Sequence, residues 1–239
     1  MTVFYEGQIS HAESVVLGSG TWALLTGEDL PEQGTITKLI RDAYAMVNIT
    51  VERKELPWKR VLVEIANLDL DGGYPFGKTT KREAKFIFSD PIGTATRYIY
   101  YRKGTVFDWK TVDDLEGLRI GIVRGSVFGA VHEELQQRIA ADPTFATIEE
   151  VAEDIQNIQK LEMGRIDICF VEQNQSNLLL SQLAKNESQF NPDVILHAPK
   201  PLMSESPLYL MFRNDKRGIY LRDLFNQGLH KLKMSHKIR

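Results

Sequence analysis

Residues 111–126 read TVDDLEGLRIGIVRGS, and this stretch indicates the fold class more clearly than any other. Residues 118–123, in which Arg119 is the one charged residue, form a mostly apolar run of strand length. Gly125 and Ser126 follow at a predicted helix start, because apolar residues recur at helical spacing from 131 to 139. A strand that leads directly into a helix is typical of an α/β fold.

The same alternation of strand and helix patterns continues in both directions from this stretch. Strands are expected at 49–56, 86–88, 98–101, 166–171, 194–197 and 208–212. Helices are expected around 36–47, 57–65, 148–163, 174–185 and 220–233. The chain is therefore α/β over its whole length, with no internal repeat.

Composition limits the classes of protein to which the chain can belong. Its 239 residues are 43% hydrophobic and 26% charged, which is enough for one large domain or for two lobes with separate cores. The formal charge of -3 provides no positive field for nucleic acid. No apolar run is long enough for a membrane span, and the N-terminus has no signal-peptide pattern. We therefore expect a cytoplasmic protein or a mature exported protein. The chain has a single cysteine, Cys169, which excludes an intrachain disulfide.

A second informative stretch is YPFGKTTKREAKFIFSDP at 74–91, which places Arg82 between a loop and a strand-like run. An arginine guanidinium matches a carboxylate in two parallel hydrogen bonds. Gly77 and the neighbouring threonines add possible amide and hydroxyl donors. The alternative is that Arg82 is a solvated surface residue beside two lysines.

The strand ends offer two further candidates for ligand contact. Ser126 lies at a strand-to-helix junction, where it could cap the helix or, with the free N–H groups there, hold an anion. Glu172 ends the run IDICFVE, at the carboxyl end of a predicted strand, where α/β proteins bind ligands. Glu172 could pair with an ammonium group while Arg82 binds a carboxylate; otherwise it is an exposed acid. Trp22 and Trp58 could pack against apolar parts of a ligand or belong to the core.

Signatures of catalysis, metal binding and dinucleotide binding are missing from the sequence. The five histidines have neither the spacing nor the partners of a metal site, so neither a metal nor a cofactor is expected. The short run Gly18-Ser19-Gly20 is interpreted as a turn that leads to Trp22, because it is too short for a dinucleotide fingerprint.

Three of these segments in this order resemble the family 3 extracellular solute-binding proteins of ABC transporters, which include polar amino-acid-binding proteins. KTTKREAKFIFSDPI is similar to the family's T-x-x-R and FS-x-P segment, and TVDDLEGLRIGIVRGS is similar to its segment DL-x-G-x-x-V-G-V-x-x-G-[ST]. LEMGRIDICFVE is similar to its G-R-x-D helix end and acidic strand end. The resemblance covers nearly the whole chain.

The resemblance implies the type II periplasmic-binding-protein-like fold, in which two lobes, each a sheet flanked by helices, are joined by two crossing strands. Lobe 1 would comprise 1–102 and 206–239, and lobe 2 would comprise 103–205. The hinge crossings would lie near 101–105 and 200–207.

The resemblance also implies roles for individual residues. Arg82 matches the arginine that binds a ligand α-carboxylate. Ser126 matches the helix start that adds hydrogen-bond donors from lobe 2, and Glu172 matches the acid that binds the α-ammonium group. Trp22 and Trp58 fall near clamp positions, and we also expect Gly77, Tyr74 and Phe128 to contact ligand. Tyr74, Pro75 and Phe76 replace the small donor residues common in amino-acid binders, so the identity of the solute is left open.

The function implied is capture of a small carboxylated solute, an amino acid above all, for import by an ABC transporter. A membrane permease would be the partner, and the protein would be a periplasmic monomer without its signal peptide. Two alternatives remain. One is an enzyme on the same scaffold, of the cyclohexadienyl dehydratase type, with Glu172 as its acid or base. The other is a sensory or orphan binding domain.

Overall fold

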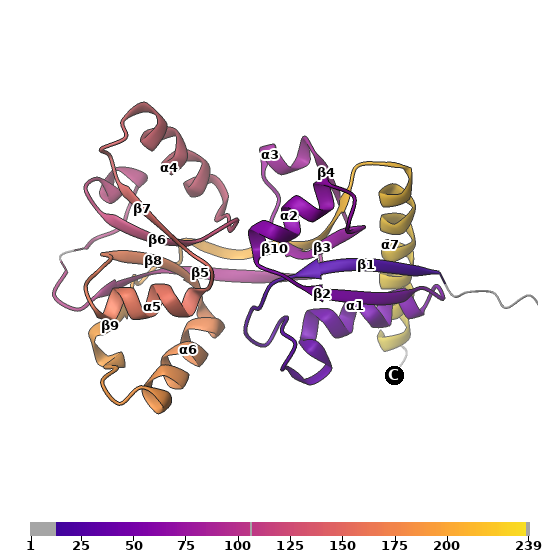
Figure 1. Ribbon diagram of the computed structural model, residues 1–239, viewed down its shortest axis with the longest axis horizontal. Coiled ribbons are helices and arrows are strands. Elements are labelled where there is room, and N and C mark those ends of the chain that lie inside the picture. Colours follow the sequence, from indigo (N-terminus) through magenta and orange to yellow (C-terminus); the bar gives the residue numbers. More distant parts are fainter. Residues whose placement is uncertain (1–12, 106, 238–239) are drawn as a thin grey trace, which may run out of the picture.

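A computed structural model of the chain describes residues 13–105 and 107–237, and it shows two α/β lobes side by side (Figure 1). The strands of lobe 1 are β1 (Ser14–Ser19), β2 (Thr50–Glu55), β3 (Gly72–Phe76) and β4 (Phe86–Phe88). Its helices are the 3-10 turn η1 (Pro31–Gln33), α1 (Thr35–Ala45), α2 (Trp58–Ala66) and α3 (Thr80–Glu83).

Lobe 2 has the same kind of architecture. Its strands are β6 (Arg119–Val123), β7 (Thr147–Val151), β8 (Ile168–Glu172) and β9 (Ile195–His197). Its helices are η2 (Val112–Leu115), α4 (Gly129–Ala141), α5 (Asp154–Glu162), α6 (Gln173–Asn186) and η3 (Pro192–Val194). Figure 1 shows α4 on one face of this sheet, with α5 and α6 on the other.

Two long antiparallel strands, β5 (Gly93–Arg102) and β10 (Met203–Arg213), connect the lobes, and both run between them in Figure 1. The strand order β2-β1-β3-β10-β5-β8-β6-β7 therefore passes from one lobe to the other at the β10–β5 pair. After β10 the chain ends in helix α7 (Lys216–Lys237), which lies at the far side of lobe 1.

Separate hydrophobic cores show where one lobe ends and the other begins. On β5, Ala95 belongs to the lobe 1 core, whereas Ile99 belongs to the lobe 2 core. On β10, Met203 packs against the lobe 2 core and Leu208 is part of the lobe 1 core. The chain thus changes lobes within four residues of β5 and within the first half of β10.

Helix α7 fixes the C-terminus to lobe 1 by close packing on α1. A Cβ added to Gly228 would lie 2.0 Å from the carbonyl oxygen of Ala43, so only glycine allows this approach. The Tyr44 hydroxyl donates a hydrogen bond to the carbonyl of Leu221 at 3.1 Å. This contact explains why residues after β10 belong to the first lobe.

Several expectations from the sequence need correction. The first crossing lies at 95–99 of β5, not near 101–105, because Tyr100, Tyr101 and Arg102 pair with β9 inside lobe 2. The expected helix at 148–163 is a strand, β7, followed by a shorter helix, α5. Gly18 and Ser19 end strand β1 instead of forming a turn.

The expected second crossing, 200–207, overlaps the Met203–Leu208 segment of β10. Residues 1–12, 106 and 238–239, which the predicted lobes include, lie outside the described residues. None of the helices in the described part of the chain is both long and apolar enough to cross a membrane.

Candidate functional site: a cavity between the lobes

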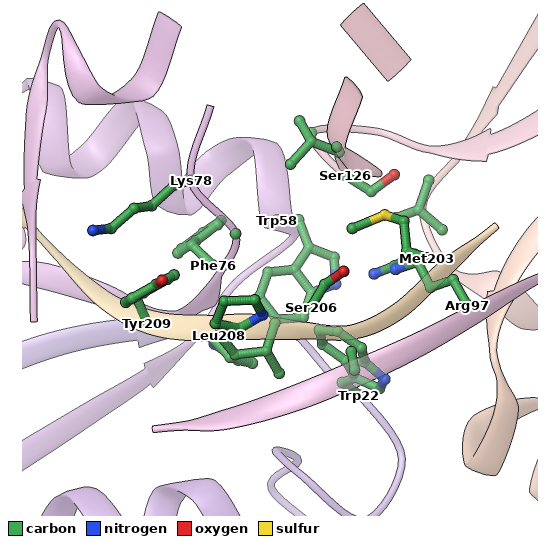
Figure 2. Close-up of a pocket in the computed structure, with 18 of the residues that line it drawn as sticks. Trp22, Trp58, Phe76, Lys78, Arg97, Ser126, Met203, Ser206, Leu208 and Tyr209 are labelled. Carbon is green, nitrogen blue, oxygen red and sulfur yellow. The ribbon is translucent and has the colours of Figure 1, made fainter. Parts of the chain in front are cut away.

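A cavity of about 250 Å³ lies between the two lobes, beside the crossing strands (Figure 2). Lobe 1 supplies Thr21, Trp22, Trp58, Pro75, Phe76, Gly77, Lys78 and Arg82 to its wall. Lobe 2 supplies Val123, Gly125, Ser126, Val127, Gly129 and Asp154. The crossing strands supply Ala95, Arg97, Met203, Ser206, Pro207, Leu208 and Tyr209. Because each lobe provides part of the wall, the cavity is complete only when the lobes are together.

Of the eight residues predicted to contact ligand, the structure brings five to this wall: Trp22, Trp58, Gly77, Arg82 and Ser126. They lie far apart in the chain and come from both lobes. The arrangement thus joins a guanidinium, a hydroxyl and two indole rings around one space.

Arg82 is positioned by short helix α3. The Thr79 side chain caps this helix by accepting a hydrogen bond from the Arg82 backbone N–H at 3.2 Å. The guanidinium is buried, and it donates to the carbonyl of Gly77 at 2.8 Å and to the carbonyl of Gly125 at 2.7 Å. Since Gly125 belongs to lobe 2, Arg82 bridges the two lobes directly.

Arg82 stays charged although its environment disfavours the charge. Burial, followed by repulsion from Arg97, lowers the pKa of Arg82 to about 10. The guanidinium is still protonated at neutral pH, and its ring-face contact with Phe76, 5.0 Å from the ring centroid, is favourable for a cation. A buried cation with few acceptors is a good anchor for an anionic group.

An aromatic wall forms the lobe 1 side of the cavity (Figure 2). The rings of Trp22 and Trp58 meet edge to face with centroids 6.2 Å apart, and Trp58 meets Phe76 in the same way at 5.7 Å. Such edge-to-face pairs hold one another in fixed orientations. The wall is therefore rigid and apolar next to the charged groups.

Ser126 lies in the cavity wall but does not cap a helix. Helix α4 begins at Gly129, and its N-cap residue is Phe128, which makes no side-chain capping bond. The Ser126 backbone N–H donates to the carbonyl of Val123 at 3.0 Å, so this amide has an acceptor within the protein. Figure 2 shows the Ser126 hydroxyl in the cavity region, where it can donate to a ligand.

Two of the predicted contact residues lie in the hydrophobic cores instead of the cavity. Tyr74 is fully buried, and its hydroxyl hydrogen-bonds to the Thr37 hydroxyl at 3.2 Å within lobe 1. Phe128 is also buried, with its ring 4.2 Å from the ring centroid of Phe170 in the lobe 2 core. Aromatic side chains next to ligand motifs in the sequence can point to the opposite side of the backbone, as these two do.

Glu172 is likewise absent from the cavity wall. Its carboxylate caps helix α6, where it accepts hydrogen bonds from the Gln175 backbone N–H at 3.0 Å and from the Asn174 amide at 3.2 Å. The side chain is buried with both oxygens occupied, so the expected ammonium partner is a structural cap.

The carboxylate on the cavity wall is that of Asp154, whereas the sequence predicts Glu172 at this place. It begins helix α5 and lines the cavity. One carboxylate oxygen, Oδ2, accepts from the Gln175 side chain at 2.9 Å, whereas Oδ1 is buried without a partner among the described residues. Burial raises the pKa of Asp154 to about 6, despite the opposing effect of Arg97.

Arg97 is the second charged residue of the cavity wall that the sequence does not indicate. It lies on β5 at the crossing, opposite Met203 of β10 and Glu172 of β8. Its guanidinium carbon is 5.0 Å from the ring centroid of Trp22. In the sequence, Arg97 directly precedes the aromatic run 98–101 and has no motif of its own. It lies at the cavity because β5 passes from one lobe to the other at this position.

The described residues contain no group of three or more His, Cys, Asp or Glu side chains that could hold a metal ion.

Comparison with known proteins places the fold in a class. No family model matches the chain, and no curated protein matches it. Solved structures do match in fold, among them amino-acid-binding proteins and a sensor domain with similarity to periplasmic binding proteins. The architecture described above is that fold.

Three of these structures illustrate the range of the class. An ancestral arginine-binding protein bound to arginine shares 18% identity, covers 92% of this chain and 92% of its own, and has a TM-score of 0.74. AbpA from Streptococcus pneumoniae is an amino acid ABC transporter substrate-binding protein bound to L-arginine. It shares 17% identity, covers 94% of this chain and 90% of its own, and has a TM-score of 0.71. A histidine kinase sensor domain with similarity to periplasmic binding proteins shares 16% over 94% and 92%, with a TM-score of 0.75. At these identities the likeness concerns the fold.

Proposed function

We propose that this protein is an extracytoplasmic solute-binding protein that captures a small carboxylated solute, an amino acid, in the cavity between its lobes for import by an ABC transporter. The observation that carries the proposal is the buried Arg82 guanidinium at the junction of both lobes. Its two hydrogen bonds to backbone carbonyls leave other N–H groups of the fork for a ligand.

The geometry supports binding that is linked to closure. Arg82 comes from lobe 1, whereas Ser126 and Asp154 come from lobe 2. A zwitterion can contact all three only when the lobes are closed, and a ligand shifts a conformational equilibrium only by such differential contacts. Arg82 takes the α-carboxylate, and Asp154, in place of Glu172, takes the α-ammonium.

The proposal includes a place of action and a partner. Solute-binding proteins of this fold that serve ABC transporters deliver their ligand to a membrane permease. We therefore assign this chain to the periplasm, as a monomer whose partner is such a permease. The absence of any membrane-spanning helix among the described residues is compatible with that assignment.

Thermal unfolding in the presence of a panel of amino acids and small carboxylates tests this function. A ligand at 100 times its dissociation constant should stabilise the protein by about 2.7 kcal/mol. We expect Arg82→Gln to abolish the stabilisation by every carboxylate in the panel, because it removes the anchoring charge. The matched control is Lys81→Gln, an exposed cation one residue away on the same helix, which should leave the stabilisation unchanged.

Two results would contradict the proposal. One is a panel in which no carboxylate shifts the unfolding midpoint of the wild-type protein. The other is an Arg82→Gln variant that folds cooperatively and keeps full affinity for a stabilising carboxylate.

A sensory role is the second candidate, because a histidine kinase sensor domain has the same fold with a TM-score of 0.75. Uptake of the stabilising ligand by cells with and without this protein separates the two roles. Loss of uptake favours transport, whereas unchanged uptake together with altered kinase phosphorylation favours sensing.

An enzyme on this scaffold needs a titratable group in the cavity, and Asp154, with its pKa of about 6, is such a group. We favour binding over catalysis because Asp154 is the only acid on the wall and no histidine lines it among the described residues. Recovery of the stabilising ligand chemically unchanged after long incubation, followed by NMR, supports the binding function.

A further inference from the structure

We infer that the ligand carries a second acid group, bound by Arg97, and is therefore an amino dicarboxylate. This inference rests on the proposed function and specifies its substrate class. It sets this protein apart from the structurally similar proteins described as bound to arginine.

The position of Arg97 is suited to a ligand contact. It extends from the crossing strand β5, and Figure 2 shows the guanidinium end of the side chain directed into the cavity, toward the side where Ser126 and Ser206 lie. The ring of Trp22 supports the guanidinium from one side, at 5.0 Å. The planar fork is thus held at a fixed place on the wall, which is how arginine recognises a carboxylate.

The Arg97 guanidinium has no hydrogen-bond acceptor among the described residues, although the charges of Asp154 and Glu172 act on it. Over residues 13–105 and 107–237, its side chain makes no hydrogen bond and no ion pair within 4.0 Å. By contrast, Arg82 in the same cavity makes two hydrogen bonds to carbonyl oxygens. A guanidinium enclosed without an acceptor is costly, so an anionic ligand group that occupies this place is strongly favoured.

The charges on the cavity wall also favour a second acid group on the ligand. Three cations, Lys78, Arg82 and Arg97, face a single acid, Asp154. Lys78 is partly engaged, because its ammonium lies 4.5 Å from the ring centroid of Tyr209. The charges of Asp154 and Glu172 act on Arg97, but a neutral zwitterion bound to Arg82 and Asp154 gives the Arg97 guanidinium no hydrogen-bond acceptor, and a cationic amino acid adds repulsion. A second carboxylate on the ligand supplies an acceptor for Arg97 and offsets the excess of positive charge on the wall.

Asp154 distinguishes an amino dicarboxylate from a simple dicarboxylate. Its Oδ1 atom is buried without a hydrogen-bond donor among the described residues, while Oδ2 is already bound to Gln175. Asp154 is the one acid among the described residues that line the cavity, so its charge favours a ligand that brings an ammonium group close to it. The cavity then matches a ligand with two carboxylates and one ammonium group.

Calorimetric titration with L-glutamate, L-aspartate, L-glutamine, L-arginine and glutarate tests the inference. At least one amino dicarboxylate should bind about 10-fold or more tightly than glutamine. The Arg97→Gln variant should bind that amino dicarboxylate about 100-fold more weakly than the wild-type protein does. Its affinity for glutamine should change less than about 3-fold. Arg165→Gln, the loss of an exposed cation on lobe 2, is the control and should change neither affinity.

The remaining comparisons separate the inference from the proposed function. Asp154→Asn should weaken binding of the amino dicarboxylate but not of glutarate. If glutamine or arginine binds more tightly than both amino dicarboxylates, the inference is overturned while the proposed function stands. The ligand's ammonium group is not recognised if glutarate binds as tightly as the amino dicarboxylates and Asp154→Asn changes none of these affinities. The inference of an amino group is then overturned. If nothing in the panel binds, the proposed function itself fails.

A folding defect in Arg97→Gln is detected by the cooperativity of its thermal unfolding without ligand. Arg97→Lys then provides the second test, because it keeps the charge and loses the planar fork. It should retain a measurable preference for the amino dicarboxylate over glutamine, with weaker binding than the wild-type protein. An unchanged affinity in Arg97→Lys would contradict recognition by the fork.

Discussion

Three charged side chains, Arg82, Arg97 and Asp154, share one enclosed space, and each is more costly there than in water. Burial lowers the pKa of both arginines and raises that of the aspartate. The ligand-free protein thus holds polar groups in an unfavourable environment, and the charges of a complementary ligand relieve this cost. Binding sites are commonly less stable than the rest of a protein for this reason.

Asp154→Asn should stabilise the ligand-free protein at pH 8. The folded-state pKa of about 6 exceeds the ordinary value of 3.8, so the folded state binds the proton more tightly and stability falls as pH rises between these values. The gain should therefore reach up to about 3 kcal/mol above pH 6 and become smaller at pH 4.5. Urea unfolding at the two pH values measures it.

Asp193→Asn is the control, because Asp193 is exposed on lobe 2 away from the cavity, and it should give no such gain. An Asp154→Asn variant that is equally stabilised at both pH values, or destabilised at pH 8, would show that burial of this carboxylate is not the cause.

The sequence predicted Arg82 because a local signal accompanies it. Thr79 caps the turn that carries Arg82, and both belong to one short motif. Arg97 has no such motif, since it reaches the cavity only through the packing of distant elements. For Asp154 a signal did exist: Glu153 and Gln156 form a capping box that marks the true start of α5.

At the scale of elements, the turn after β6 meets the first turn of α2 across the cleft. Gly125 has φ +80, and a Cβ added there would lie 3.1 Å from the backbone nitrogen of Lys59 and 3.2 Å from its Cα. Glycine is therefore required twice, for its left-handed backbone and for the close approach of lobe 2 to lobe 1.

Gly125→Ala should weaken ligand binding at least about 5-fold, because the added methyl group pushes the lobes apart in the closed state. Gly117→Ala is a matched control: Gly117 has φ +74, but an added Cβ meets nothing within 4 Å. Both variants should lose about 1 kcal/mol of stability from the backbone, and only Gly125→Ala should lose affinity.

Calorimetry measures the affinities, and small-angle X-ray scattering should show a larger radius of gyration for Gly125→Ala alone. Equal affinities in the two variants would mean that contact between this turn and α2 does not contribute to closure.

Elements were predicted well where one pattern dominated, as in α1, whose buried Ile36, Ile40, Ala43 and Tyr44 lie on one face. Prediction failed at 147–163, where a strand and a helix adjoin and their apolar residues merge into one apparent helix. The crossing on β5 was also misplaced, because a strand that changes lobes keeps the same local pattern throughout.

At the scale of the whole molecule, two lobes with separate cores meet at a cavity, and among the described strands only β5 and β10 continue from one lobe to the other. The Arg82 hydrogen bond to Gly125 spans the cleft, so the same residue that we assign to the ligand also holds the lobes together. Such an arrangement couples ligand binding to closure through a single guanidinium.

The most direct test is a calorimetric cycle in which both the ligand and the protein lose the proposed contact. The tightest-binding amino acid is compared with its α-carboxamide analogue, in the wild-type protein and in Arg82→Gln. We predict that the wild-type protein binds the carboxylate about 100-fold more tightly than the amide, and that Arg82→Gln distinguishes them less than about 3-fold. The same discrimination in both proteins would contradict the account, because the carboxylate would then be bound elsewhere.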